Sequence, residues 1–220
     1  MKTLKRASLV TLLVNLVLMG FQVWAGWTSG SNAMVADGAH SLMDVLTDAL
    51  VAAAIFWVHH NPNGHRKHLL PVVAAFASLM VMAVGAEFLL VSFFAPFNQG
   101  DDTIRHVTLY SLVIALASFL VKGCLYGYLK WTAAQAEKHG HANYAGVLRA
   151  SARHTGVDSI SSCIAAIGVT GMLAGAPFFD RGATALIGCL IFLFGFMQKE
   201  NPVWLLASRF IRSIRSGKFA

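Results

Sequence analysis

The stretch GAHSLMDVLTDAL, residues 38–50, places three ionisable side chains in a run that is otherwise rich in Leu, Val and Ala. His40 and Asp44 are four residues apart, so on a helix their side chains lie on one face, one turn apart. Asp48 continues that face by one further turn. Ionisable groups are costly in an apolar helix and usually mark a functional site there. The stretch therefore predicts a polar face with a function inside a set of apolar helices.

The composition of the whole chain is that of a membrane protein. Its 220 residues are 56% hydrophobic and only 12% charged, and the mean hydropathy is +0.62, whereas soluble domains carry about 25% charged residues. The cysteines are scattered through apolar segments and predict no disulfide framework. The net charge of +7 is better explained by cytoplasmic Lys and Arg than by nucleic-acid binding.

Six stretches are apolar and long enough for a membrane-spanning helix, which needs about 20 residues. They are predicted at residues 7–28, 34–58, 69–95, 106–131, 145–174 and 182–198. The basic first stretch is too long for the apolar core of a signal peptide and lacks a clear cleavage site. We therefore predict an all-α polytopic membrane protein. Its six-helix transmembrane bundle occupies residues 1–208, and residues 209–220 form a short basic cytoplasmic tail.

The distribution of Lys and Arg predicts how the bundle is oriented. Basic residues precede the first helix, separate the second from the third and the fourth from the fifth, and follow the sixth. The opposite side has only Arg105 and Arg181. Because basic residues favour the cytoplasmic side, we expect both termini in the cytoplasm. In a bacterium, the expected location is the inner membrane.

The fifth predicted helix repeats the spacing of the second. In SARHTGVDSISS, residues 151–162, His154 and Asp158 are again four residues apart. Two antiparallel helices that each offer one imidazole and one carboxylate can converge on one point, and two nitrogens with two oxygens suit tetrahedral zinc. Imidazole also favours a transition-type cation over calcium or magnesium. A hydrogen-bonded packing role is the alternative for one such pair, but two copies argue against it.

These residues resemble the transmembrane domain of the cation diffusion facilitator family, which includes zinc transporters. The resemblance is carried by TSGSNAMVADGAHSLMDVLTDALV, NPNGHRKH and VLRASARHTGVDSISSCIAAIGV, at residues 28–51, 61–68 and 147–169. It also covers Asp180, just before the sixth predicted helix. By this resemblance, the metal ligands are His40, Asp44, His154 and Asp158. The resemblance associates two His and two Asp mainly with zinc, and an Asp at position 40 with broader selectivity.

Two features of the family are expected to be altered here, the C-terminal domain and the histidine site in the loop after the second helix. Most members continue into a cytoplasmic metal-binding domain of ferredoxin-like fold, and this chain is expected to lack that C-terminal domain. Family members resemble homodimers, so we expect a homodimer held by membrane helices.

Histidines of the loop after the second helix are candidates for a further metal site. The loop HHNPNGHRKH keeps His65 at the glycine–histidine step of the family, whereas Asn61 stands where a ligand His can occur. His59, His60 and His68 are the possible substitutes. The alternative is a solvated basic loop near the membrane surface. His139 and His141 offer the same choice in the loop before the fifth helix.

Other charged residues extend or interrupt the apolar helices. We interpret Asp48 as an inner relay of an ion or proton path, with a hydrogen bond to a neighbouring helix as the alternative. Asp37 is either a release residue of that path or a helix N-terminal charge favoured by the dipole. Lys122 is expected to snorkel from a helix end. Glu87 is more central and needs a partner or a water-filled cavity.

The sequence thus predicts a secondary transporter, not an enzyme, that exports Zn²⁺ from the cytoplasm in exchange for protons. There is no ATP-binding motif, and metal and protons compete for the same imidazoles and carboxylates. No cofactor is expected, since zinc is the transported substrate. The expected partners are the metal ion, protons, the lipid bilayer and a second copy, but no nucleic acid.

Two alternatives to a zinc exporter remain. The first is a haem-binding membrane redox subunit in which His40 and His154 are axial ligands. An Asp one turn after each His argues against it. The second keeps the transporter fold with Co²⁺, Cd²⁺, Fe²⁺ or Mn²⁺ as substrate, a choice that ligand type narrows without settling.

Overall fold

The computed structural model describes residues 2–60, 69–94, 109–140, 142–198 and 201–203, and this part of the chain is all α-helical. The helices are α1 (Lys2–Ser29), α2 (Asn32–His60), α3 (Leu69–Phe94), α4 (Leu109–Lys138), α5 (Ala142–Leu173) and α6 (Phe178–Phe196). The predicted all-α bundle is confirmed. Several helices extend past the predicted apolar stretches, because helical hydrogen bonding continues into polar turns outside the apolar segment.

Five of the described helices are long and apolar enough to cross a membrane, namely α1, α3, α4, α5 and α6. The predicted second span also forms a helix, α2, but the side chains of its residues 51–60 lie outside the described structure. Its polar residues face inward: Asp37 and His40 are buried, whereas Leu42 and Leu46 are exposed. In a bilayer this arrangement turns the apolar side of α2 outward and keeps its ionisable groups among the other helices.

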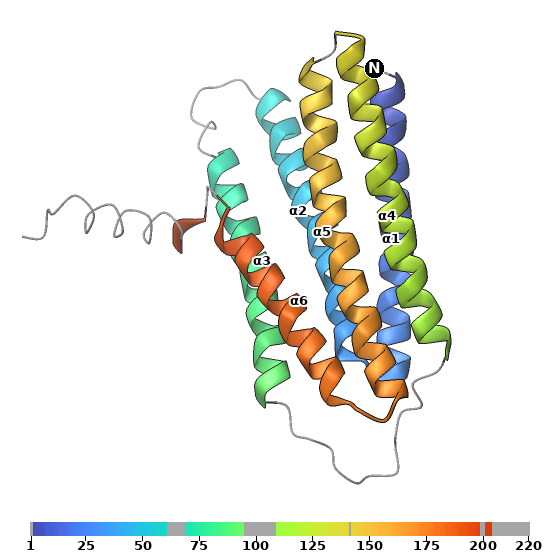
Figure 1. Ribbon diagram of the computed structural model, residues 1–220. Coiled ribbons are helices and arrows are strands. Elements are labelled where there is room, and N and C mark those ends of the chain that lie inside the picture. Colours follow the sequence, from blue (N-terminus) through green and yellow to red (C-terminus); the bar gives the residue numbers. More distant parts are fainter. Residues whose placement is uncertain (1, 61–68, 95–108, 141, 199–200, 204–220) are drawn as a thin grey trace, which may run out of the picture.

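The helices form two groups that contact each other through α2 and α5. In Figure 1, α1, α2, α4 and α5 run side by side, while α3 and α6 form a tilted pair beside them. The most extensive packing joins α4 to α5, α3 to α6 and α1 to α2, and α2 also contacts α3, α5 and α6. The two predicted metal-binding helices, α2 and α5, therefore lie next to each other in the interior.

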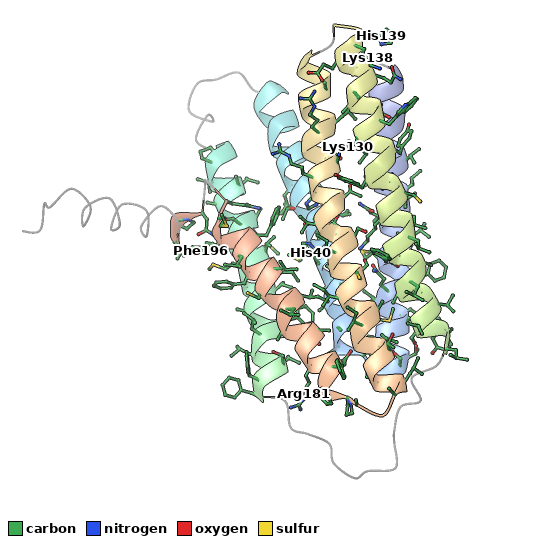
Figure 2. All side chains as sticks on the ribbon, in the orientation of Figure 1. His40, Lys130, Lys138, His139, Arg181 and Phe196 are labelled. Atoms are coloured by element: carbon green, nitrogen blue, oxygen red, sulfur yellow. The ribbon has the colours of Figure 1, made fainter. Side chains whose placement is uncertain are left out.

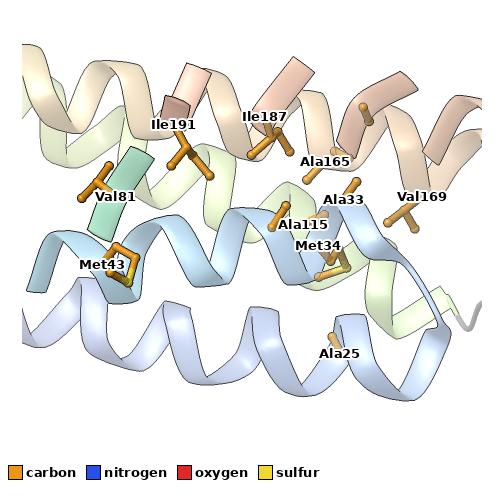
Figure 3. Packing of buried hydrophobic residues seen from close by; sticks show 13 residues of the cluster. Ala25, Ala33, Met34, Met43, Val81, Ala115, Ala165, Val169, Ile187 and Ile191 are labelled. Atoms are coloured by element: carbon orange, nitrogen blue, oxygen red, sulfur yellow. The ribbon is translucent and has the colours of Figure 1, made fainter. Parts of the chain in front are cut away.

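Small residues allow the helices to approach closely. A Cβ added to Gly85 of α3 would lie 2.3 Å from the backbone nitrogen of Phe192 in α6. A Cβ added to Gly195 of α6 would lie 2.6 Å from the nitrogen of Met82. The main apolar cluster is likewise rich in alanine, as Figure 3 shows for Ala25, Ala33, Ala115 and Ala165. Close backbone contact of this kind favours helix association within a membrane.

Asp180 joins the start of α2 to the first turn of α6. Its carboxylate accepts hydrogen bonds from the Ser31 hydroxyl at 2.5 Å and from the backbone N–H groups of Asn32 at 2.9 Å and Ala33 at 3.3 Å. These N–H groups belong to the first turn of α2 and have no partner within the helix. The prediction that Asp180 precedes the sixth helix is wrong, because α6 already begins at Phe178.

Candidate metal centre

The two His-x-x-x-Asp pairs of α2 and α5 meet in the interior. His40 Nε2 lies 3.4 Å from Asp158 Oδ1, and His154 Nε2 lies 3.3 Å from Asp44 Oδ2. Within each helix, His40 Nε2 lies 3.8 Å from Asp44 Oδ2 and His154 Nε2 lies 3.9 Å from Asp158 Oδ2. Each carboxylate therefore faces one imidazole from each helix. We call these four side chains the His–Asp ring, and Figure 2 places His40 midway along the bundle.

The dimensions of the His–Asp ring suit a small divalent cation. Ligand atoms of His40, Asp44 and Asp158 all lie within 4.8 Å of one another, and His154 lies outside this compact group of three. Zinc binds nitrogen and oxygen at about 2.0–2.1 Å, so neighbouring ligands of a tetrahedron lie about 3.4 Å apart. The two distances between helices, 3.3 and 3.4 Å, match that value. The two distances within helices need a contraction of about half an ångström.

Carboxylate oxygens of the ring are buried without a hydrogen bond. Among the described residues, Asp44 Oδ2 and Asp158 Oδ1 have no hydrogen-bond partner, and neither does His40 Nδ1. A buried carboxylate oxygen left unpaired costs free energy, which a bound cation or a protonated imidazole offsets. The ring is therefore built to accept positive charge.

One side of the ring is more open than the other. The side chains of His40 and Asp158 are each 3% exposed, whereas that of Asp44 is 12% and that of His154 is 30% exposed. Phe194 of α6 packs against both imidazoles, with ring centroids 6.4 Å from His40 and 5.5 Å from His154. A single Phe in an apolar helix carries no signal in the sequence, so sequence reasoning missed this neighbour of the site.

A second polar cluster surrounds Asp37. The Lys122 side chain is buried, and its Nζ lies 3.6 Å from Asp37 Oδ1. Asp37 also accepts hydrogen bonds from Gln22, Ser161 and Ser162. The expectation that Lys122 snorkels from a helix end is therefore wrong, because it lies in the middle of α4 and has an anionic partner.

Two further expectations about charges are corrected. The alternative of Asp37 as a helix N-terminal charge is wrong, since α2 has no acidic residue in its first turn and Asp37 is buried farther along. Glu87 was expected to be central and to need a partner or a water-filled cavity, but its side chain is exposed on the surface of α3.

The remaining candidates lie at the limits of the described structure. The backbone of Asp48 belongs to α2, but its side chain is outside the described part, so its path role stays a prediction. His59 and His60 end α2 with side chains that are likewise not described, and His65 and His68 lie outside the described residues. The loop metal site is therefore untested. His139 is exposed near the end of α4, and His141 lies outside the described residues.

The family model described as the cation efflux transmembrane domain matches residues 8–197. Manganese efflux system protein MneP of Bacillus subtilis is 27% identical over 200 residues, which cover 86% of this chain and 63% of that protein. Metal tolerance protein C1 of Arabidopsis thaliana is 32% identical over 186 residues, covering 76% and 37% of the two chains. Metal tolerance protein 2 of Oryza sativa is 29% identical over 208 residues, covering 82% and 51%. The chain thus spans less than two thirds of the length of each relative.

Proposed function

The chain belongs to the cation efflux transmembrane domain family, and we propose that it exports Zn²⁺ across a membrane in exchange for protons. The observation that carries the proposal is the His–Asp ring. It offers two imidazole nitrogens and two carboxylate oxygens, and its imidazole–carboxylate distances of 3.3–3.9 Å are close to the ligand separation of a tetrahedral zinc site. The unpartnered carboxylate oxygens among the described residues leave the ring ready for a cation.

Zinc is the preferred substrate because of the donor atoms. Imidazole nitrogen suits zinc and its neighbours in the transition series, whereas Mg²⁺, Ca²⁺ and Mn²⁺ prefer oxygen. Mn²⁺ is the second candidate, because one relative is named for manganese efflux. An all-oxygen ring would favour manganese, and half of the donors here are nitrogen.

Protons are the proposed counter-ion because they compete with the metal for the same atoms. A metal ion needs neutral imidazoles, while protons on His40 and His154 would satisfy the same two carboxylates. One occupant therefore excludes the other. The haem alternative is not proposed, because each Nε2 already faces a carboxylate oxygen at 3.3 or 3.4 Å, where a porphyrin would have to lie.

We further propose that both termini face the cytoplasm. Figure 2 shows Lys130 and Lys138 toward one end of the bundle and Arg181 at the opposite end. Arg149 follows Lys138 across the short α4–α5 connection. This excess of basic side chains at one end favours its location on the cytoplasmic side.

Transport by the purified full chain tests the proposed function. The protein is reconstituted into vesicles with a pH gradient, and Zn²⁺, Cd²⁺ and Mn²⁺ are each followed with a trapped metal-sensitive dye. We expect zinc flux that depends on the pH gradient and is lost in Asp44→Ala. Lys130→Met serves as the control, because Lys130 is exposed and contacts only its own helix neighbour Tyr126 in the described structure. Zinc flux of parental size in Asp44→Ala would refute the ring as the transport site.

A further inference from the structure

The ion pair of Lys122 and Asp37 lies deep inside the bundle. Both side chains are 1% exposed, and the Lys122 Nζ is 3.6 Å from Asp37 Oδ1. A buried ion pair of this kind recovers its desolvation cost only with good geometry and further hydrogen bonds. Well-packed apolar residues would often be as stable. Stability alone therefore does not explain why an ion pair lies next to the proposed transport site.

Hydrogen bonds fix both members of the pair. Asp37 accepts bonds from the Gln22 amide and from the hydroxyls of Ser161 and Ser162, the last at 2.7 Å. These donors come from α1 and α5. Lys122 donates to the Ser41 hydroxyl at 3.2 Å. The ammonium group is thus held by α2 and cannot reach the lipid.

The Lys122–Asp37 pair is hydrogen-bonded to residues close to the His–Asp ring on both helices of the ring, α2 and α5. Ser41, which receives the Lys122 hydrogen bond, directly follows the ring residue His40. On α5, the hydroxyl oxygens of Ser161 and Ser162 also lie 2.9 and 3.1 Å from the backbone oxygen of Asp158. The fixed ammonium charge therefore lies about one helical turn from ligands on each side of the ring.

We propose that Lys122 is a tethered counter-cation that sets the charge of the transport site. With neutral imidazoles, Asp44 and Asp158 give the ring a charge of −2, and Lys122 cancels the charge of Asp37. A single divalent ion then makes this interior neutral. Without Lys122, the interior would carry −3 and would hold a divalent cation too tightly to release it. Asp180, the other buried carboxylate named above, lies apart from the ring, at the start of α6, where it caps α2.

The inference rests on the proposed metal centre, and the sign of an affinity change separates it from a packing role. Removing the ammonium in Lys122→Met should tighten Zn²⁺ binding by about tenfold or more, since a positive charge close to a cation in low dielectric is repulsive. A tightly held ion leaves slowly, so the same variant should export zinc more slowly. Loss of packing alone would weaken binding and slow transport together.

A set of matched variants completes the test. Asp37→Asn should weaken Zn²⁺ binding by about tenfold or more, because it leaves the ammonium uncompensated. The double variant Asp37→Asn/Lys122→Met restores the net charge and should bind zinc within about threefold of the parent, a difference of under 1 kcal/mol. Lys122→Arg keeps the charge, and Lys130→Met removes an exposed charge from the same helix. Both should bind as the parent does.

The measurement is competition of the full purified chain with a fluorescent zinc chelator at constant neutral pH, together with flux in vesicles. Weaker or unchanged zinc affinity in folded Lys122→Met overturns the inference. Should either single variant fail to fold, the double variant decides, and a loss of more than about tenfold there also overturns it. A parent that binds no zinc, in contrast, defeats the proposed function itself.

Discussion

Replacing Asp158 with Asn should separate the stability of this protein from its affinity for zinc. Asp158 is buried and faces His40 at 3.4 Å and His154 at 3.9 Å. Asn has nearly the same shape but no charge. Four-ligand zinc sites bind with about 10–16 kcal/mol, so one ligand is worth about 3 kcal/mol. The expected loss is therefore about two orders of magnitude in zinc affinity.

The free energy of unfolding without metal should change in the opposite sense. The substitution removes a buried negative charge and keeps an oxygen facing His40, so the metal-free variant should be at least as stable as the parent. Asp180→Asn is the matched control, because Asp180 is buried in the same bundle but caps α2. It should cost about 0.5–2 kcal/mol of stability and leave zinc affinity within about threefold.

Zinc titration with a competing chelator and thermal unfolding in detergent measure the two quantities. The reasoning fails if Asp158→Asn binds zinc within about tenfold of the parent. It also fails if Asp180→Asn loses as much zinc affinity as Asp158→Asn does. In that case a general loss of structure, not a missing ligand, would explain both results.

Three further predictions follow from the ring and the helix surfaces. His40→Asp should reduce the preference for zinc over manganese, because an oxygen replaces a nitrogen donor; an unchanged competition profile would remove His40 from selectivity. Zinc binding should release protons and weaken as the pH falls through about 6.5, the pKa of an ordinary imidazole, since protonated imidazoles cannot bind metal. Calorimetry in buffers of different ionisation enthalpy measures this release, and equal heats in all buffers would argue against it. The chain should be a dimer in detergent by mass measurement, because small residues permit close helix contact; a strictly monomeric, transporting protein would contradict this.

The sequence was sufficient to predict the members of the ring but not how they pair. A spacing of four residues places His40 with Asp44, and His154 with Asp158, on one face of each helix. The shorter distances nevertheless run between helices, from His40 to Asp158 and from His154 to Asp44. Those distances depend on the rotation and depth of α2 relative to α5, which no local pattern encodes.

The same limit explains the wrong expectation for Lys122. An isolated Lys in an apolar helix gives no indication of its partner, and Asp37 lies 85 positions earlier in the chain. Only the packing of α4 against α5 and α1, which both contact α2, brings the two side chains together. Asp180 was likewise assigned to a loop, because its role as a cap depends on α2, almost 150 residues away.

The hydrogen bonds of Asp180 attach the start of α6 to the start of α2. Phe194, fourteen residues along α6, rests on the imidazoles of the ring. Fourteen residues of helix span about 21 Å, so a swing of about 10° around this attachment would carry Phe194 by about 4 Å. A small rotation of α6 about its hydrogen-bonded start would therefore move Phe194 by several ångströms relative to the His–Asp ring.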